Sequence, residues 1–358
     1  MIPVLLLTPD SLPGRDAMVA DPVQVLQRDA GAVPLLPVDE VEITTLYENV
    51  VDLGVTGGGP VERQRSKGAP FTSRLLADEQ KTPFVGGHGL ALLVKVTRDG
   101  ITRSILFDAG GSPDGLVHNL DCLELKPNEW SCIVLSHGHW DHVLGLIGLE
   151  QRLGQLRMPL VLHPDAFLKR GTMSATGKIE GSAYLSRQGL RDAGLALTET
   201  VQPSLVLDGT ILVTGQVERT NDFETGWSAH YAERDGTWTP DPLICDDQAI
   251  VVNIKGKGLA VISGCGHAGI VNMASYARVL TGVDRVMAVM GGFHLGPAAF
   301  HNRIDSVINT LIGFEPSVIA PAHCTGYRAA YAVYERRPDA FVQNTVGTRI
   351  TLKADAAD

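Results

Sequence analysis

The chain has 358 residues, of which 44% are apolar and 20% charged. This is the composition of a globular protein long enough for one large α/β domain or two modest ones. The formal net charge of -10, without any run rich in lysine or arginine, argues against nucleic acid as a partner. The longest apolar runs have the length of a strand and fall short of the ~20 residues that a membrane span requires.

The cysteines and the N-terminus predict a cytoplasmic protein. The cysteines are odd in number and scattered, at Cys122, Cys132, Cys245, Cys265 and Cys324. Such a set is typical of free thiols in a reducing compartment rather than of a disulfide framework. The N-terminal stretch MIPVLLLTPDSLPGRD is briefly apolar but lacks the basic residues that begin a signal peptide.

The first part of the chain is expected to be irregular. Residues 1–40 are rich in proline and aspartate, and we interpret them as an N-terminal extension with some helix around DPVQVLQRDA (21–30). The stretch EVEITTLYENVVD (40–52) is typical of a strand. Residues 55–83 then form a loop-rich insertion, because glycine and proline interrupt them throughout.

Short apolar runs predict most of the strands that follow. GLALLVKV (89–96) and RSILFDAG (103–110) are joined by the turn TRDG, which indicates a hairpin. CIVLS (132–136) and PLVLHP (159–164) are further strands, and the polar residues 169–192 are expected to form a surface excursion. SLVLDGTILVTG (204–215) and DQAIVVNIKGKGLAVISGCG (247–266) each indicate a pair of strands with a glycine turn.

The C-terminal third alternates between strands and helices. The predicted strands are LAVISGCGH (259–267), RVMAVMGGFH (285–294) and SVIAPAHCTG (317–326), and the predicted helices are NMASYARVLTG (272–282), DSVINTLIGF (305–314) and RAAYAVYERR (328–337). Asn272 and Asp305 are suitable N-caps for the first two helices. This alternation predicts an α/β architecture in which helices cover a sheet.

Residues with metal-binding side chains follow the predicted strands. They are Asp108, the cluster at 137–142, Cys265 with His267, His294, and His323. Open α/β sheets place their functional sites outside the carboxyl ends of the strands. We therefore expect these side chains to come together at one edge of the molecule.

The cluster itself lies in VLSHGHWDHVLGL (134–146). His137 and His139 are two residues apart, so in an extended segment their rings point the same way. Asp141 and His142 are adjacent and can diverge toward a second metal about 3.5–4 Å from the first. Imidazole and carboxylate together suit zinc, iron or manganese, and Gly138 permits a tight turn between the ligands. A set of unrelated surface or core histidines is the alternative, which the spacing disfavours.

The spacing H-x-H-x-D-H resembles the signature of the metallo-β-lactamase superfamily, whose αββα fold carries one or two metals. The resemblance extends over residues 45–335, through HGLALLVK, ILFDAGGS, DDQAIVVN, GLAVISGCGHAGIVN and APAHCTG, and is weakest at 165–240. It implies a single domain over 41–358 with insertions near 55–83 and 165–240. The branch it most resembles contains archaeal-type dihydropterin–ribofuranosylaminobenzene phosphate synthases and related metallo-hydrolases. One departure is Leu144, where that branch usually has glycine.

The resemblance also implies further ligands. His323 matches the final histidine of the superfamily. Gly264-Cys265 stands where relatives have a "GD" pair, so Cys265 or His267, two residues on, is expected to bind metal; a buried inert thiol is the alternative for Cys265. Asp246 or Asp247 offers an oxygen ligand, or else both belong to a solvated turn.

The resemblance implies roles beside the metals for three more residues. Asp108 is expected to orient the histidine loop from behind the ligands rather than to bind metal. His294 matches a histidine that contacts substrate or protonates a leaving group in related phosphodiesterases, with a structural role as the alternative. His88 either lines the pocket or packs. His118, His163, His230 and His301 have no motif support and are interpreted as structural.

These features favour a binuclear metal-dependent hydrolase, acting on a small-molecule ester, lactone, amide or phosphodiester through a metal-bound hydroxide. Asp141 and His294 are its expected catalytic residues, and its cofactors are two divalent ions, zinc before iron or manganese. One alternative is a synthase joining a pterin to an aminobenzene ribosyl phosphate, which would need a basic phosphate-binding patch. The candidates for that patch are Arg63, Arg65, Lys67, Arg74, Lys169 and Arg170. The same fold is also compatible with an iron redox enzyme or with a sensor that has a degenerate site.

Overall fold

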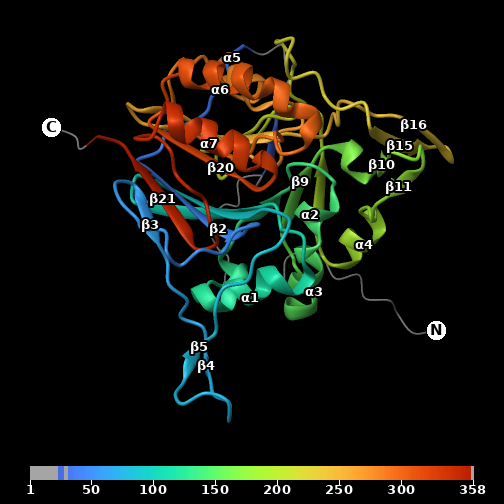
Figure 1. Ribbon diagram of the computed structural model, residues 1–358. Helices are drawn as coiled ribbons and strands as arrows, with labels where there is room; N and C mark the ends of the chain where they lie inside the picture. Colours follow the sequence, from blue (N-terminus) through green and yellow to red (C-terminus); the bar gives the residue numbers. More distant parts are fainter. Residues whose placement is uncertain (1–22, 28–30, 356–358) are drawn as a thin grey trace, which may run out of the picture.

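The computed structural model describes residues 23–27 and 31–355. Two large sheets lie face to face, and helices cover the outer face of each, giving four layers in the order αββα (Figure 1). The fold is therefore the αββα sandwich that the resemblance implied.

The first sheet is mixed and has eight strands. In spatial order they are β12 (Ala196–Glu199), β9 (Pro159–Leu162), β8 (Cys132–Val134), β7 (Ile101–Phe107), β6 (Ala91–Arg98), β2 (Glu40–Tyr47), β21 (Thr348–Lys353) and β3 (Val61–Arg63). Strands β6 and β7 form the expected hairpin, and both residues of its turn, Asp99 and Gly100, have positive φ. Such turns match the twist of the flanking strands.

The second sheet has seven strands. In spatial order they are β1 (Val23–Val25), β13 (Ser204–Val206), β14 (Ile211–Val213), β17 (Ala249–Ile254), β18 (Gly258–Ser263), β19 (Val286–Gly292) and β20 (Val318–Ala322). Strands β18, β19 and β20 are parallel neighbours, so their carboxyl ends lie at the same edge. This arrangement brings the segments after β18, β19 and β20 together.

Helices cover both outer faces. Those on the first sheet are α1 (Pro113–Leu123), α2 (Trp140–Val143), α3 (Gly145–Leu153) and α4 (Arg187–Asp192), and those on the second are α5 (Ile270–Thr281), α6 (Ile304–Gly313) and α7 (Tyr327–Arg336). Four short 3₁₀ turns occur among the described residues: η1 (Pro127–Glu129), η2 (Pro164–Phe167), η3 (Ala298–Arg303) and η4 (His323–Thr325). No described helix is long and apolar enough to span a bilayer.

The core has three layers because both faces of each sheet are covered. On β6, Leu92 and Val94 face the other sheet, whereas Leu93 packs under the helices of its own side. Adjacent residues of a strand point to opposite faces, so a strand buried on both faces must be apolar throughout. The continuous apolar runs of the sequence have this cause.

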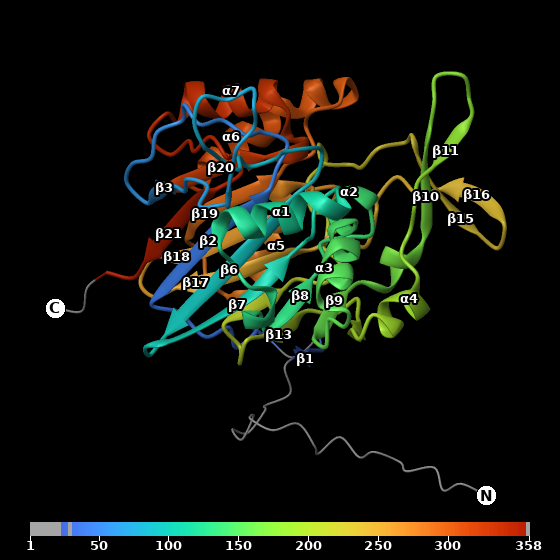
Figure 2. The same cartoon turned by 90° about the horizontal axis from the view of Figure 1, so that it is seen from below.

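Two elements project from the sandwich. Strands β4 (Pro70–Phe71) and β5 (Gln80–Lys81) form an arm within the loop-rich residues 55–83 (Figure 1). On another side, β10 (Lys169–Met173), β11 (Ile179–Gly181), β15 (His230–Arg234) and β16 (Thr237–Pro240) form a four-stranded sheet in the order β11-β10-β15-β16 (Figure 2). Residues 169–192 are therefore partly a sheet rather than only a surface excursion.

Three local predictions are wrong. Residues 23–25 of the expected N-terminal helix form strand β1, which pairs with β13; the flanking residues 21–22 and 28–30 lie outside the described residues. The N-cap of α5 is Gly269, and Asn272 lies within the helix, where its amide donates to the carbonyl of Ala268. The N-cap of α6 is Arg303, because a 3₁₀ turn leads directly into that helix and leaves Asp305 in its first turn.

Candidate metal centre

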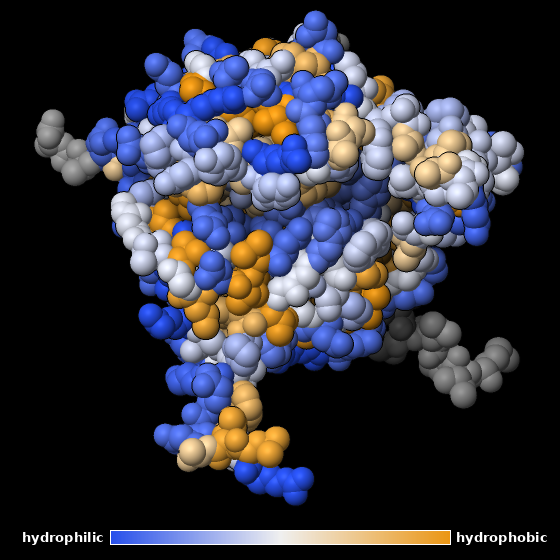
Figure 3. Space-filling model, viewed as in Figure 1, coloured by the Kyte–Doolittle hydropathy of each residue, from blue (hydrophilic) through white to orange (hydrophobic). Residues whose placement is uncertain are grey.

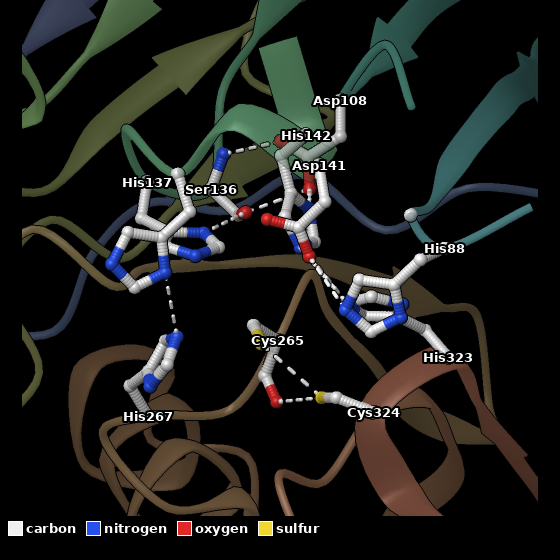
Figure 4. Close-up of polar contacts among 12 residues, drawn as sticks. His88, Asp108, Ser136, His137, Asp141, His142, Cys265, His267, His323 and Cys324 are labelled. Carbon is white, nitrogen blue, oxygen red and sulfur yellow. Dashed lines mark hydrogen bonds and ion pairs between the residues drawn. The ribbon is translucent and has the colours of Figure 1, made fainter. Parts of the chain in front are cut away.

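Three histidines form the first ligand group. His137 and His139 follow β8 in an extended segment that ends where α2 begins, and His267 follows β18. His139 Nδ1 lies 3.2 Å from His267 Nε2, and one ring nitrogen from each of the three lies within 4.8 Å of the others. The rings therefore converge on one point from two sheets; His137 and His267 are labelled in Figure 4.

Asp141, His142 and His323 form the second group. His323 Nε2 lies 3.1 Å from Asp141 Oδ2 and 3.2 Å from His142 Nε2. The Nε2 atom of His142 is 3.6 Å from the same Asp141 oxygen. Asp141 and His142 belong to the short helix α2, whereas His323 follows β20, so this group also joins the two sheets.

Cys265 lies between the two groups. Its sulfur is within 4.8 Å of ring nitrogens of His137 and His142. The same sulfur is 3.2 Å from the sulfur of Cys324 (Figure 4). Cys265 thus occupies the position from which one ligand atom could reach both groups.

Asp108 and Asn49 orient the second group from behind. Nδ1 of His142 donates to Asp108 Oδ2 at 2.7 Å, and Nδ1 of His323 donates to Asn49 Oδ1 at 3.1 Å. The proton is therefore on Nδ1 in each ring, and the lone pair of Nε2 is available to a metal ion. Hydrogen-bonded partners commonly fix the tautomer of metal-binding histidines in this way. The backbone N–H of His323 also donates to the buried carboxylate of Glu48.

Three residues of the site adopt left-handed backbone angles without being glycine. The φ angles are 58° at Asp108, 46° at His294 and 49° at His323. Each such residue costs on the order of 1–3 kcal/mol and persists only where the surrounding structure enforces it. Each of the three comes directly after a strand or in the first residues beyond it, and the bend turns its side chain toward the site.

Glycine is needed at position 138 for a reason other than the tight turn that the sequence suggested. Its φ is not in the left-handed region, but a Cβ atom there would lie 2.0 Å from the carbonyl oxygen of Ala166. Glycine is required because two backbones approach closely. Leu144, the departure from the branch pattern, has φ -64° and ψ -28° at the junction of α2 and α3, a conformation that does not need glycine.

Burial and neighbouring charges set the protonation of the ligands. Burial lowers the pKa of His139 and that of His323 to about 4, and it lowers the pKa of His267 well below the ordinary value. Burial opposes charge on His142 too, but the carboxylates of Asp108 and Asp141 raise its pKa to about 9. Three of these imidazoles are therefore neutral at neutral pH, the form that binds metal.

These residues fit divalent metal ions. Nε2 of His137 is buried and has no hydrogen-bond partner, while its Nδ1 lies 2.9 Å from the hydroxyl of Ser136. Buried polar atoms almost always have a hydrogen-bond partner. An unpartnered Nε2 atom beside other ligand nitrogens therefore indicates a binding site for a cation. Imidazole, carboxylate and thiol donors together suit zinc or iron.

Asp246 and Asp247 lie beside the ligand groups, and each accepts hydrogen bonds from the loops around the site. Among the described residues, the clusters whose ligand atoms lie within 4.8 Å of one another include neither. Asp246 accepts from the guanidinium of Arg170 and from the backbone N–H of Gly138, at 2.9 Å in the latter case. One oxygen of Asp247 accepts from the N–H of Ala268, and burial raises the pKa of this carboxyl to about 7. Asp246 thus supports the loop that carries Gly138. The other oxygen of Asp247 is buried without a hydrogen-bond partner in the described part of the chain, so its role as an oxygen ligand stays a prediction.

A pocket with a volume of about 160 Å³ opens over both groups. Figure 3 shows a hydrophilic recess between the two halves of the sandwich. His88 and His294 line the pocket; Nε2 of His88 is 3.4 Å from Asp141 Oδ2, and the ring of His294 is centred 4.0 Å from that of His267. The pocket is therefore the place from which a substrate could reach both groups.

The proposed phosphate-binding residues lie elsewhere or are already paired. Arg170 is the one arginine or lysine among the described residues that line the pocket, and it is buried between Asp241 and Asp246, 2.8 Å and 2.6 Å away. Lys169 pairs with Glu233 outside the pocket. Arg63 lies on β3, and Arg65, Lys67 and Arg74 lie between β3 and β5. None of these four residues lines the pocket.

Sequence reasoning missed several residues of the site. His230, interpreted as structural, lines the pocket, with its ring centred 5.8 Å from that of His139 and 5.3 Å from that of His267. Cys324 lines it as well, and Glu48 and Asn49 support His323. Their positions in the chain could have indicated these residues: Glu48 and Asn49 directly follow β2, and Cys324 directly follows His323. His118, His163 and His301 do not line this pocket.

Comparison with known proteins agrees with this geometry. Residues 85–280 match the family model of the metallo-β-lactamase superfamily. A 7,8-dihydropterin-6-methyl-4-(β-D-ribofuranosyl)-aminobenzene-5'-phosphate synthase of Methanocaldococcus jannaschii is 30% identical over 263 residues, covering 69% of this chain and 84% of the relative. The uncharacterized protein MJ0448 of the same organism is 31% identical over 252 residues, covering 69% and 87%.

Among solved structures, Tm1679, described as a metal-dependent hydrolase of the β-lactamase superfamily, superposes with a TM-score of 0.64. The two chains are 20% identical, and the match covers 88% of this chain and all of that one. The chain belongs to the metallo-β-lactamase superfamily. Proteins with this fold bind divalent metals, and the two side-chain groups described above are the candidate ligands in this chain.

Proposed function

We propose that this chain is a metal-dependent hydrolase that uses two divalent ions, zinc before iron or manganese, to cleave an ester, lactone, amide or phosphodiester bond in a small molecule. The observation that carries the proposal is the convergence of two ligand groups, each drawn from both sheets. When bound, such ions polarise the scissile group and lower the pKa of water to about 7, which supplies a nucleophile at neutral pH.

The ligands divide between the two positions by geometry. His137, His139 and His267 would hold one ion, and Asp141, His142 and His323 would hold the other. Cys265 lies where it could bind either ion or both. Burial raises the pKa of the Cys265 thiol well above its ordinary value, so its deprotonation requires the charge of a nearby cation.

The chain's own side chains would bind and orient the substrate. Asp141 is a ligand whose oxygen also faces the pocket beside His88, so it can accept a hydrogen bond from the attacking water. His294 faces the same space from the opposite sheet and is positioned to hydrogen-bond the leaving group. His230 and Trp140 also line the pocket.

The synthase is the second candidate, and the observation in its favour is the named relative at 30% identity. In that reaction the metal site would help a phosphate or pyrophosphate group to leave while an aromatic amine or a carbon nucleophile adds. We rank hydrolysis first because Arg170 is the one arginine or lysine among the described residues that line the pocket, and its charge is already paired with two carboxylates.

Elemental analysis of protein purified without added metals is the first test. We expect about two zinc per chain, and a loss of metal in His139→Ala. His118→Ala is the matched control, because His118 is partly exposed and hydrogen-bonds the carbonyl of Pro83 outside the pocket. Absence of metal even after reconstitution would overturn both enzyme proposals and favour a sensor. Iron in place of zinc would favour redox chemistry.

A substrate panel then separates the two enzymes. The wild type and His139→Ala would be assayed on aryl esters, lactones, amides and phosphodiesters, with and without an added aromatic amine. Cleavage without the amine, lost in His139→Ala but kept in His118→Ala, supports the hydrolase. Turnover that requires the amine and releases phosphate or pyrophosphate would instead favour the synthase.

A further inference from the structure

Two cysteines that are 59 residues apart in the chain meet in the lining of the pocket. The sulfur of Cys324 lies 3.2 Å from the sulfur of Cys265 and donates a hydrogen bond to the carbonyl oxygen of Cys265 at 3.0 Å (Figure 4). Both side chains line the pocket; Cys265 is buried and Cys324 is partly exposed. Neither the fold nor the proposed hydrolysis requires two thiols in contact.

The contact depends on a glycine in the strand between them. Cys265 follows β18 and Cys324 follows β20, and β19 lies between these two strands. At the end of β19, a Cβ atom on Gly292 would lie 2.8 Å from the sulfur of Cys324 and 2.9 Å from the Cα of Cys265. Because Gly292 has no side chain, the two thiols can reach each other across the middle strand.

We propose that Cys265 and Cys324 form a dithiol site that a peroxide oxidises reversibly to a disulfide. Cys324, the more exposed thiol, attacks the O–O bond of hydrogen peroxide and becomes a sulfenic acid, and the second peroxide oxygen leaves as water. The sulfur of Cys265 then displaces the hydroxyl group of the sulfenic acid, which leaves as a second water with the thiol proton. Two thiols and one peroxide thus give one disulfide and two waters. Small side-chain rotations are sufficient, because the sulfurs are already in contact.

Oxidation would also change the metal centre. The sulfur of Cys265 lies within 4.8 Å of ring nitrogens of His137 and His142, and a sulfur in a disulfide can no longer act as a thiolate ligand. Cys324 also directly follows His323 in the short turn η4, so closing the disulfide pulls on the backbone of that ligand. This consequence depends on the proposed metal site, whereas the disulfide itself does not.

The test measures thiols and therefore does not depend on substrate. The full chain, reduced and then freed of reductant, is treated with hydrogen peroxide; its free thiols are titrated after denaturation and its cysteine peptides are mapped by mass spectrometry. We expect the five thiols of the chain to fall to three, a linked peptide joining Cys265 to Cys324, and full recovery with dithiothreitol. Loss of the linked peptide in Cys324→Ser but not in Cys245→Ser, a matched change at another partly exposed cysteine, supports the proposal.

Three results would overturn the dithiol site: five intact thiols, irreversible sulfinic or sulfonic acids at Cys324, or a linkage between different cysteines. The effect on the metal centre is read separately, from the zinc that oxidised and reduced protein retain after dialysis against a chelator. Lower zinc retention in the oxidised form supports the effect of the disulfide on the metal centre. Equal retention with the disulfide present would overturn the link to the metal centre, while failure of both forms to bind zinc would point to the proposed function instead.

Discussion

Asp108 Oδ2 lies 2.7 Å from Nδ1 of His142, and both side chains are fully buried. The same oxygen accepts from the hydroxyl of Ser136 at 2.7 Å, and Oδ1 accepts from the backbone N–H of Ser136. A single carboxylate therefore fixes both the start of the histidine loop and the orientation of a ligand ring. This relationship joins the end of β7 to the metal centre.

Asp108→Asn should weaken metal binding with little change in side-chain size. The amide keeps one acceptor oxygen and places an NH₂ group against the other donors. These are the backbone N–H of Ser136 in one orientation, and the Ser136 hydroxyl together with Nδ1 of His142 in the other. Loss of such a support typically costs about 10–100-fold in metal affinity. Competition with a zinc-binding dye measures the change. Asp121→Asn, at an exposed residue paired with Arg152, is the matched control, and equal affinities in the two variants would contradict the assigned role.

Gly138→Ala should destabilise the protein and reduce its metal content. The new Cβ would lie 2.0 Å from the carbonyl oxygen of Ala166, so the segment between two ligands must move. Overpacking of this kind typically costs about 1–3 kcal/mol. Urea denaturation and elemental analysis measure both effects. Gly313→Ala is the control: it lies in α6 with nothing within 4 Å of its added Cβ and should be neutral or stabilising by up to about 1 kcal/mol. A fully stable, metal-loaded Gly138→Ala would show that the close approach can relax.

Arg170→Met should be strongly destabilising. The guanidinium pairs with the buried carboxylates of Asp241 and Asp246. Its loss removes the cationic partner of Asp246, whereas Asp241 keeps its ion pair with Arg234 at 3.2 Å. Removing one partner of a buried ion pair typically costs about 3–5 kcal/mol. In contrast, Arg187→Met removes a half-exposed pair with Glu199 and should cost within about 1 kcal/mol. The free energy of unfolding of the two variants provides the comparison, and similar small losses would mean that the buried carboxylates become protonated at little cost.

Glu224→Gln should change how stability depends on pH. Burial raises the pKa of Glu224 above its ordinary value, although hydrogen bonds from Asn221 and from the N–H groups of Val271 and Asn272 oppose the rise. When the pKa of a group is higher in the folded than in the unfolded state, its protonation stabilises the folded protein. This contribution to stability is fully present below the pKa of the unfolded state and is lost as pH rises through the pKa of the folded state. The stability of the variant relative to the wild type should therefore increase from acidic to mildly alkaline pH. Denaturation midpoints across that range measure this, and a constant difference would show that the pKa is not raised.

Much of the fold could be predicted from the sequence because its causes are local. Glycine and proline mark the turns, and continuous apolar runs mark strands buried on both faces. The C-terminal alternation gave the right order of α5, β19, α6, β20 and α7. Helix starts were less predictable: Asn272 and Asp305 have the chemistry of an N-cap, but neither occupies that position, since a tight loop and a 3₁₀ turn begin those helices.

For the site, the sequence by itself determined the ligand types and the strand ends that carry them. Spacing alone placed His137, His139, Asp141 and His142 in one loop, because neighbours in the chain are necessarily neighbours in space. Only the tertiary structure decided that His267 joins the first pair and His323 the second, that His230 reaches the pocket, and that Arg170 is bound by carboxylates. The contact between Cys265 and Cys324 likewise exists only because two sheets and an intervening glycine place their loops together. Contacts between segments far apart in the chain depend on how the sheets pack, which no local pattern encodes.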